Sequence, residues 1–367
     1  MKKILYFLLC ILLCIGIGGS AFVLYKNFGT DKEPTTQGGD VTIDDGKEGV
    51  TDFDEPPADN SGNGSSDGSD DTQTELTPPA DETSYIAEGM TMLAGASVYM
   101  GDDETLDPAI RFTCLIDNEL KAEVEADENK SFAILVAPLD YFDTVNSDAN
   151  TYIDWVKAFA GAGKTVIMET YDGYGTYNDY TSYMRFTLTN VLYNNINRRF
   201  VAMGVLIDNS SGTPTYKYSA MPEGQTYRTN ARSVAYVAGA ALNAYALGEA
   251  DIPETQVTKL QSYINMAVDK CKGLTEATDD GSMPVVTLTT SNSVMMPLSG
   301  THQIGLELEP AALNVPARLV SSNESVATVS ETGLISAVSY GSATISIYIC
   351  GEVYTVSVTV SSNVQYV

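Results

Sequence analysis

Five tyrosines recur at every third position in one short stretch, and their spacing and type point to a binding surface. The stretch reads YDGYGTYNDYTSYMRF at residues 171–186. Tyrosine offers a flat apolar ring and a hydroxyl group at a low cost in side-chain entropy, which suits the binding of glycans or peptides. Neighbouring carboxylate and amide groups are able to orient ligand hydroxyls or to bind calcium. The predicted ligand-binding residues are Tyr174, Tyr177, Tyr180, Asp172, Asn178 and Asp179.

No regular element places all five rings on one face. A spacing of three drifts around a helix, and Gly173 and Gly175 disfavour a helix. In a strand the same spacing alternates between faces. We therefore expect a strand, a turn-rich loop over 174–180, and a second strand. The alternative interpretation, which stays open, is that Tyr171 and Tyr183 pack inward while the loop rings cover neighbouring surface.

Catalytic chemistry has weaker support in the sequence. Asp140 lies close to Asp143, and Glu169 lies close to Asp172, as paired carboxylates of a glycan hydrolase would. The chain has 48 acidic residues, however, so such pairs arise by chance. No catalytic residue, cofactor or metal site is predicted.

The net charge of −28 excludes nucleic acid as a partner, because nucleic-acid binding needs clustered Lys and Arg. Residues 31–84 hold 16 acidic and 2 basic residues, which is half of the net charge. Residues 27–84 are rich in Asp, Gly, Ser, Thr and Pro, and we expect a disordered acidic linker.

An uncharged apolar run of 22 residues, Ile4–Tyr25, follows Lys2 and Lys3. About 20 such residues span a bilayer as a helix, and the lysines favour a cytoplasmic N-terminus. Residues 1–26 are predicted to be a membrane anchor. The alternative is a signal sequence cleaved near Gly19–Ala21, which would release a secreted protein.

Cysteine and histidine usage argues against a disulfide scaffold or a zinc site. Cys114, Cys271 and Cys350 are far apart in the sequence, and His302 is the only histidine. Buried free thiols are predicted, with a Cys114–Cys271 bridge as the alternative. We expect His302 to be a surface strand residue rather than a ligand.

Residues 85–283 are predicted to form an α+β domain with a mostly antiparallel sheet. The apolar runs that predict its strands are at 108–117, 131–138, 164–171, 183–192, 199–208 and 215–220. Helices are expected at 148–163, at 229–248 with Asn230 as a possible cap, and at 251–273. The last of these places Val257, Leu260, Ile264, Ala267, Val268 and Cys271 on one face, which we expect to dock on a sheet.

Residues 284–367 alternate apolar and polar positions in short runs, which predicts an all-β sandwich. The runs GSATISIYI and EVYTVSVTV frame Gly351-Glu352 as a hairpin turn. Gly300, the stretch SSNESVATVSETGLISAV at 321–338 and GSATI at 341–345 closely resemble the bacterial Ig-like group 2 domain. Val320 stands where that family often has tryptophan. The resemblance, over residues 285–361, implies an extracellular seven-stranded sandwich that serves as a spacer or adhesive module and carries no catalytic set.

Part of the preceding domain, within residues 90–240, loosely resembles a domain of Gram-positive surface proteins with no settled activity. The similar stretches are GASVYM, AIRFTCLI, LTNVLYNNINRRFVAMGVLI and RSVAYVA. Tyr99 stands where an arginine is expected.

The predicted function is non-catalytic binding or adhesion at the bacterial envelope, through a surface glycan or protein ligand of the 85–283 domain. The first alternative is a structural spacer or assembly component of the envelope. The second is an extracellular glycan hydrolase.

Overall fold

The computed structural model describes residues 86–98, 108–142, 167–171, 174–189, 191–212, 214–278 and 280–362. The predicted anchor Ile4–Tyr25, the acidic linker and the expected helix at 148–163 lie outside these residues. Within the described ranges, no helix combines the length and the apolar character that crossing a membrane requires. Contacts divide the described chain into an N-terminal unit, residues 86–233, and a C-terminal unit, residues 234–362.

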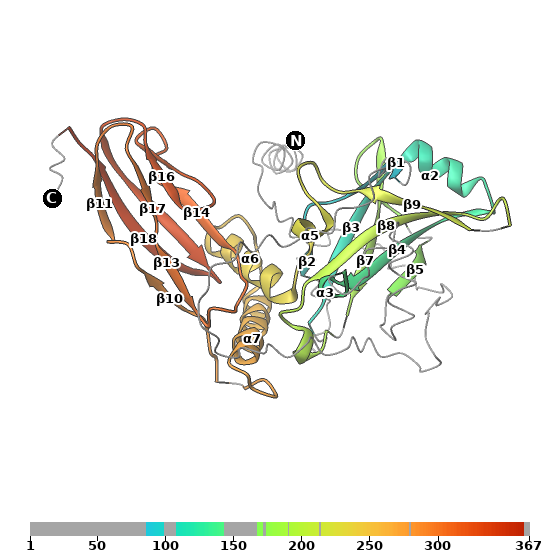
Figure 1. Ribbon diagram of the computed structural model, residues 1–367, viewed down its shortest axis with the longest axis horizontal. Coiled ribbons are helices and arrows are strands. Elements are labelled where there is room, and N and C mark those ends of the chain that lie inside the picture. Colours follow the sequence, from blue (N-terminus) through green and yellow to red (C-terminus); the bar gives the residue numbers. More distant parts are fainter. Residues whose placement is uncertain are drawn as a thin grey trace, which may run out of the picture. The chain divides into compact units, whose positions relative to one another are not determined.

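A nine-stranded sheet forms most of the N-terminal unit (Figure 1). Its strands are β1 (Ile86–Met92), β2 (Ser97–Val98), β3 (Ile110–Asp117), β4 (Lys130–Pro138), β5 (Ile167–Tyr171), β6 (Gly175–Thr176), β7 (Thr181–Leu188), β8 (Phe200–Asp208) and β9 (Thr215–Ala220). They run in the order β5-β4-β8-β9-β1-β3-β7-β6, with β2 paired to β3. The β1–β9 pair is parallel and the other pairs described are antiparallel, so the sheet is mixed but mostly antiparallel.

The burial of each strand follows its sequence pattern. Strands β3 and β7 alternate, and their buried residues face one another across the pair, as Phe112 does with Phe186. Strand β4 is buried at seven successive positions, which is typical of a central strand covered on both faces. On β8, a Cβ atom added to Gly204 would lie 2.6 Å from Cys114 Sγ, so only glycine permits this close packing.

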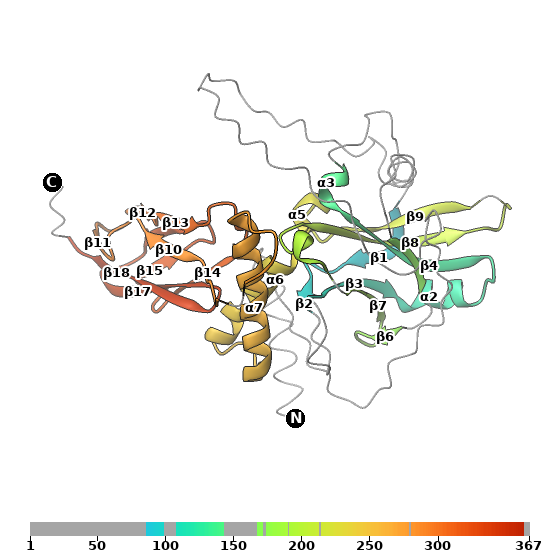
Figure 2. The ribbon, with the colours of Figure 1, turned by 90° about the horizontal axis from the view of Figure 1, so that it is seen from below.

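Short helices lie between or after these strands: α2 (Asn118–Glu125), α3 (Leu139–Phe142), the 3-10 helix η2 (Tyr193–Asn195) and α5 (Tyr227–Asn230). Helix α2 was not expected from the sequence, because it follows β3 directly, with no glycine or proline between them. Figure 2 shows α2 beside β4. Val124 is its fully buried side chain.

The interpretation of Asn230 as a helix cap is wrong. Thr226 begins α5, and its side chain and that of Thr229 form a reciprocal capping box. Asn230 is the last residue of α5, and its side chain instead bonds Leu93 O (3.3 Å) and the Gly95 amide. The asparagine therefore fixes the turn after β1.

The C-terminal unit contains α6 (Val234–Ala246), α7 (Glu254–Cys271) and a set of short strands (Figure 1). The strands are β10 (Val285–Leu288), β11 (Ser293–Met296), β12 (Thr301–Gln303), β13 (Leu306–Glu309), β14 (Ala317–Ser321), β15 (Ala327–Val329), β16 (Leu334–Ala337), β17 (Gly341–Ile349) and β18 (Glu352–Val360). They form the sheets β11-β18-β17-β14, β12-β16-β15 and β10-β13. Ile335, Ile345 and Val356 are fully buried between them.

The apolar face of α7 was predicted correctly, but its partner was not. Val257, Leu260 and Ile264 are buried, and α7 packs mainly on α6 rather than on a sheet. Helix α6 in turn packs on β14, β17 and β18. By their contacts both helices therefore belong with the sandwich, whereas the sequence placed them in the 85–283 domain.

The β17–β18 hairpin closes with a two-residue turn against α6. Cys350 and Gly351 have φ of 52° and 89°, so both are left-handed, as a type I′ turn requires. The turn lies one residue before the predicted Gly351-Glu352. On α6, Asn243 Oδ1 accepts a hydrogen bond from Gly351 N (3.0 Å), and Asn243 Nδ2 donates to Pro316 O (2.9 Å). Asn243 is 3% exposed, so this contact is part of the core.

The three described cysteines are free thiols, as predicted. Cys114 and Cys350 are buried, and burial raises the pKa of each to about 12. Cys271 is only half-buried. His302 lies in β12, also as predicted, with Nε2 3.5 Å from Thr290 Oγ1.

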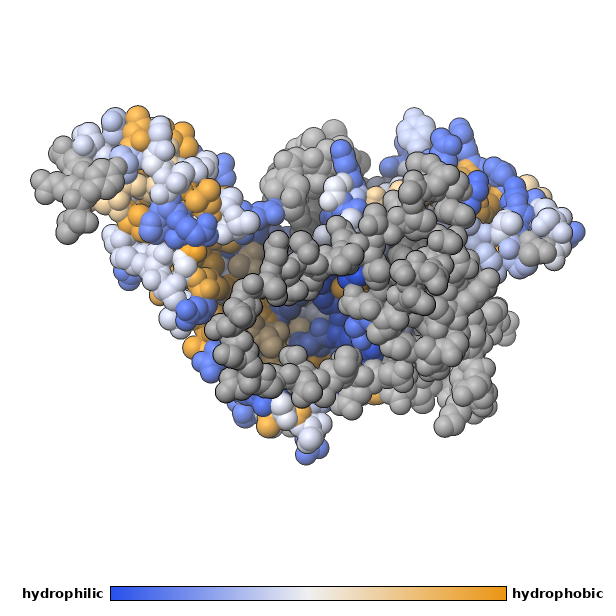
Figure 3. Space-filling model, in the orientation of Figure 1, coloured by the Kyte–Doolittle hydropathy of each residue, from blue (hydrophilic) through white to orange (hydrophobic). Residues whose placement is uncertain are grey.

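The visible face of the sandwich mixes polar and apolar residues (Figure 3). Its exposed large apolar side chains include Val285, Met295, Val338 and Val353. Apolar residues that are scattered singly are normal on a protein surface.

Candidate functional site

The tyrosine-rich stretch forms a β-hairpin at one edge of the large sheet. Strand β6 pairs with β7 through Gly175 opposite Tyr183 and Thr176 opposite Ser182. The Tyr177 and Asn178 amides both donate to Thr181 O, at 2.9 and 3.1 Å, and close the loop. The predicted strand–loop–strand arrangement is present, with a short strand added inside the expected loop. We call residues 177–180 the hairpin tip.

Asn118, the first residue of α2, holds the hairpin tip in place. Its amide donates to Tyr180 O (2.9 Å) and its Nδ2 donates to Asp179 O (3.1 Å). Its Oδ1 accepts from Ser182 Oγ (2.7 Å). Two of these hydrogen bonds fix the tip against the start of α2, and the third joins the same asparagine to β7 beside the tip. The sequence reasoning missed Asn118, although an asparagine directly after a strand is a common turn or cap residue.

The three candidate tyrosines have different environments. The Tyr174 ring meets Phe132 edge to face, with centroids 6.0 Å apart and an interplanar angle of 81°. Lys121 Nζ of α2 lies 4.9 Å from the centroid of the Tyr174 ring. Tyr177 is half-buried, whereas Tyr180 is 80% exposed. Tyr174 therefore contributes to packing, and Tyr180 alone of the three is largely available to a ligand.

The polar candidates lie around the same tip. Asn178 and Asp179 are exposed, and Asn178 Oδ1 accepts from the Tyr180 amide (2.8 Å), which is an Asx turn. Asp172 lies outside the described residues. The hairpin tip thus brings Asn178, Asp179 and Tyr180 together on one exposed turn.

The base of the hairpin contains a stacked pair that the sequence reasoning did not assign. Arg185 Cζ lies 4.0 Å from the centroid of the Tyr183 ring. On the neighbouring strand β6, residue 175 must be glycine to leave room for the Tyr183 ring, because a Cβ atom added there would lie 2.0 Å from Tyr183 Cζ. The pair could have been predicted from the sequence, because side chains two positions apart on a strand, such as Tyr183 and Arg185 on β7, lie on the same face.

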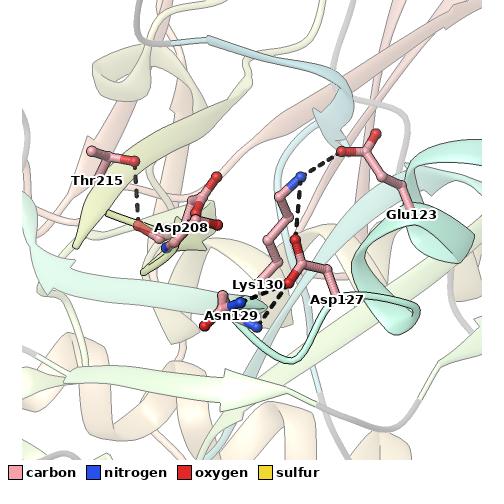
Figure 4. A network of polar contacts seen from close by, with 7 residues as sticks. Glu123, Asp127, Asn129, Lys130, Asp208 and Thr215 are labelled. Atoms are coloured by element: carbon pink, nitrogen blue, oxygen red, sulfur yellow. Dashed lines mark hydrogen bonds and ion pairs between the residues drawn. The ribbon is translucent and has the colours of Figure 1, made fainter. Parts of the chain in front are cut away.

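A second polar cluster joins the end of α2 to the sheet, at the opposite end of that helix from the hairpin tip (Figure 4). It consists of Glu123, Asp127, Asn129, Lys130, Asp208 and Thr215. Lys130 Nζ lies 2.7 Å from Glu123 Oε1 and 3.9 Å from Asp127 Oδ2. The hydrogen bond to Glu123 raises the pKa of Lys130. Solvent-exposed ion pairs of this kind stabilise weakly, so we assign the cluster a structural role.

The carboxylates considered for hydrolysis do not form a described pair. Arg198 binds Asp140 with two hydrogen bonds, of 2.9 Å and 2.7 Å, and this engages both oxygens of the carboxylate. Asp143, Asp172 and the side chain of Glu169 lie outside the described residues. No three His, Cys, Asp or Glu side chains gather as a metal site in the part of the chain that the structure describes.

Residues 289–349 match the bacterial Ig-like domain (group 2). The C-terminal sandwich is therefore an Ig-like domain of this bacterial class, as the sequence resemblance indicated. The match leaves the N-terminal unit unassigned, and the likeness of that unit to a Gram-positive surface domain stays a prediction. No curated protein gives a significant match to the chain.

Two solved structures have limited similarity. An EHEC O157:H7 intimin mutant is 14% identical over 22% of this chain and 48% of its own, with a TM-score of 0.17. HBP35 of Porphyromonas gingivalis is 11% identical over 74% of this chain and 64% of its own, with a TM-score of 0.16. This chain thus spans less than two thirds of either protein. Similarity at this level carries no argument about the N-terminal unit.

Proposed function

We propose that this protein is a non-catalytic binding or adhesion protein of the bacterial cell surface. In this proposal Ile4–Tyr25 anchors it as a single-pass membrane protein, and the acidic linker carries the folded units outside the cell. The N-terminal unit binds a surface glycan or protein, and the Ig-like domain is a spacer.

The observation that carries the proposal is the hairpin tip. A tyrosine that is 80% exposed stands on a turn that Asn118 fixes with hydrogen bonds to Asp179 O and Tyr180 O, and with a third to Ser182 beside the turn. A rigid aromatic side chain loses little entropy on binding, and its ring can stack on the apolar face of a sugar. Asn178 and Asp179 add exposed polar groups beside it.

The matched pair of variants is Tyr180→Ala and Tyr340→Ala. Tyr340 is 58% exposed and lies in the Ig-like domain, so it controls for the loss of an exposed tyrosine elsewhere. The full chain in detergent micelles would be applied to a glycan array and to purified bacterial envelopes. Wild type and Tyr340→Ala should bind equally, and Tyr180→Ala should bind about 10–100-fold more weakly.

Two results would contradict the proposal. Equal binding by both variants would place the binding surface away from the hairpin tip. No binding of wild type to any array glycan or envelope would favour the structural spacer.

A further inference from the structure

Three exposed carboxylates lie beside the exposed ring of the hairpin tip. Asp179 belongs to the tip, and Asp117 and Glu119 flank Asn118 in the sequence. Asn118 donates hydrogen bonds to the backbone of Tyr180 and Asp179, which brings the three residues to one corner of the N-terminal unit. We call these three side chains the tip carboxylates. Exposed carboxylates are negatively charged at neutral pH, so Tyr180 stands on a turn with negative charges on both sides.

The charge of the tip carboxylates is not balanced within the described part of the chain. None of the ion pairs between described residues involves a tip carboxylate. Lys121 is the one basic residue of α2, and its Nζ lies 3.7 Å from Glu125 Oε1 and 4.9 Å from the centroid of the Tyr174 ring. Opposite charges attract one another over about 10 Å at moderate salt. The hairpin tip therefore favours a cationic ligand over a neutral or anionic one.

The other tyrosine rings of this hairpin already bind cations, independently of the carboxylates. The ammonium group of Lys121 lies 4.9 Å from the centroid of Tyr174, and the guanidinium of Arg185 lies 4.0 Å from that of Tyr183. The face of an aromatic ring attracts a cation electrostatically. None of the cation–ring contacts between described residues involves Tyr180, and its ring is 80% exposed. Tyr180 therefore offers to an external cation what its two neighbours offer to cations of the chain.

The apolar surface at the hairpin tip is small, which favours a sugar over a protein as the ligand. The exposed large apolar side chains among the described residues of the N-terminal unit are Tyr180 and Leu192. Leu192 follows the end of β7 that is away from the tip. A stable protein interface buries about 800 Å² on each partner, around a core of several apolar side chains. A single ring with polar groups beside it instead matches the apolar face and the polar edge of one sugar unit.

We propose that the hairpin tip binds a glycan of amino sugars whose amino groups are free and protonated. The Tyr180 ring stacks on the apolar face of one sugar, the tip carboxylates attract its ammonium group, and Asn178 lies beside them for the hydroxyl groups. An N-acetylated sugar lacks the positive charge and is held by stacking and hydrogen bonds alone. This inference rests on the proposed function and specifies the ligand of the same site.

The matched probes are the immobilised hexasaccharides of glucosamine and of N-acetylglucosamine, which differ in the charge on the amino group. Binding of the full chain in detergent micelles is measured in mildly acidic buffer, in which sugar amines are protonated and exposed carboxylates stay charged. Wild type should bind the glucosamine form about 10-fold more tightly than the N-acetylated form. The double variant Asp179→Asn/Glu119→Gln keeps the side-chain shapes and should reduce this preference to about 2–3-fold.

The control is the double variant Glu324→Gln/Glu331→Gln. Both glutamates are exposed on the Ig-like domain, so this variant loses the same net charge away from the hairpin tip. It should keep the full preference for the glucosamine form. All variants retain the acidic linker, so any attraction of the linker for a cationic glycan is common to them. All four substitutions are at exposed positions, where the loss of stability is small.

Three results would overturn this inference alone. Equal binding of the two hexasaccharides, both weakened by Tyr180→Ala, would make the hairpin tip a site for neutral glycans. A glucosamine preference that survives in Asp179→Asn/Glu119→Gln would place the attraction outside the tip. Binding of hexalysine that depends on Tyr180, with no binding of either hexasaccharide, would identify a basic protein segment as the ligand. If Tyr180→Ala binds both hexasaccharides and hexalysine as wild type does, the proposed function of the hairpin tip fails as well.

Discussion

Two β-hairpins of this molecule are each held by an asparagine of a neighbouring helix, but one turn is buried and the other is exposed. The β17–β18 hairpin is held by Asn243 of α6, and the β6–β7 hairpin is held by Asn118 of α2. In each case the asparagine side chain bonds backbone groups at or beside the turn. The first turn is buried, with Cys350 only 3% exposed, whereas the second presents Tyr180 at 80% exposure.

The difference lies in what surrounds each asparagine. Asn243 is 3% exposed, and its two hydrogen bonds reach part-buried backbone groups to which water has limited access, so a lost partner leaves those groups poorly satisfied. Asn118 is half-buried, so water can replace its side-chain bonds. Asn243 therefore contributes mainly to the stability of the protein, and Asn118 mainly to the conformation of a surface turn.

The largest effect is expected for Asn243→Ala. This change empties a buried side-chain position and leaves the part-buried Gly351 N and Pro316 O without their side-chain partner, so the free energy of unfolding should fall by about 2–4 kcal/mol. Denaturant unfolding of the full chain measures it. A loss below about 1 kcal/mol would show that Asn243 does not hold the buried hairpin.

Asn118→Ala should cost less stability, about 0.5–1.5 kcal/mol, because water can satisfy the exposed carbonyl of Asp179. The same variant should weaken ligand binding several-fold, since the turn that presents Tyr180 loses its side-chain support. Unfolding and binding are measured on one preparation. A larger stability loss than for Asn243→Ala would contradict the expectation that Asn243 contributes more to stability than Asn118.

The reactivity of the Cys350 thiol reports whether the β17–β18 turn stays buried. Burial raises the pKa of Cys350 from 9.0 to about 12, so its thiol is neutral at pH 8 and shielded from reagents. Cys271 is half-buried and should react with iodoacetamide before Cys350. Mass spectrometry of timed samples measures both rates. In Asn243→Ala, labelling of Cys350 should accelerate at least about 10-fold. An unchanged rate would contradict the claim that Asn243 holds the β17–β18 turn in its buried position.

The same shift gives a pH dependence with a defined sign. A folded pKa above the unfolded value means that the stabilisation is complete below pH 9 and is lost as pH rises from 9 towards 12. Cys350→Ala should flatten this part of the stability curve. Cys114, whose pKa is also raised to about 12, should keep its own contribution in the variant and serves as the internal control.

The smallest effect is that of Tyr180→Ala on stability, which should stay within about 0.5 kcal/mol because the ring is exposed. Tyr174→Ala should cost more, because it removes the contact with the buried Phe132. Denaturant unfolding of the two variants tests whether tyrosines of one sequence motif have separate roles. Equal costs would argue against that separation.

The sequence was sufficient for the strands whose apolar runs stand out, such as β4 and β8, and for the Ig-like domain. It was not sufficient for α2, because no break residue separates that helix from β3. It also misplaced the partner of α7, since an apolar stripe shows that a face is buried but not what covers it. For the candidate site, periodicity excluded a single aromatic face. Pairing of β6 with β7 and the position of Asn118 decided which ring is exposed. The contact of Asn118 joins residues 61 positions apart, which the local sequence pattern does not show.

Hydrogen exchange of the full chain, with and without the array glycan that binds best, tests whether the hairpin tip is the binding surface. Ligand protects amides that it covers or rigidifies. We expect added protection at residues 177–181, the hairpin tip and its closing residue, and no change at Cys350 and Gly351. Protection confined to the Ig-like domain, or none at the hairpin tip, would contradict it.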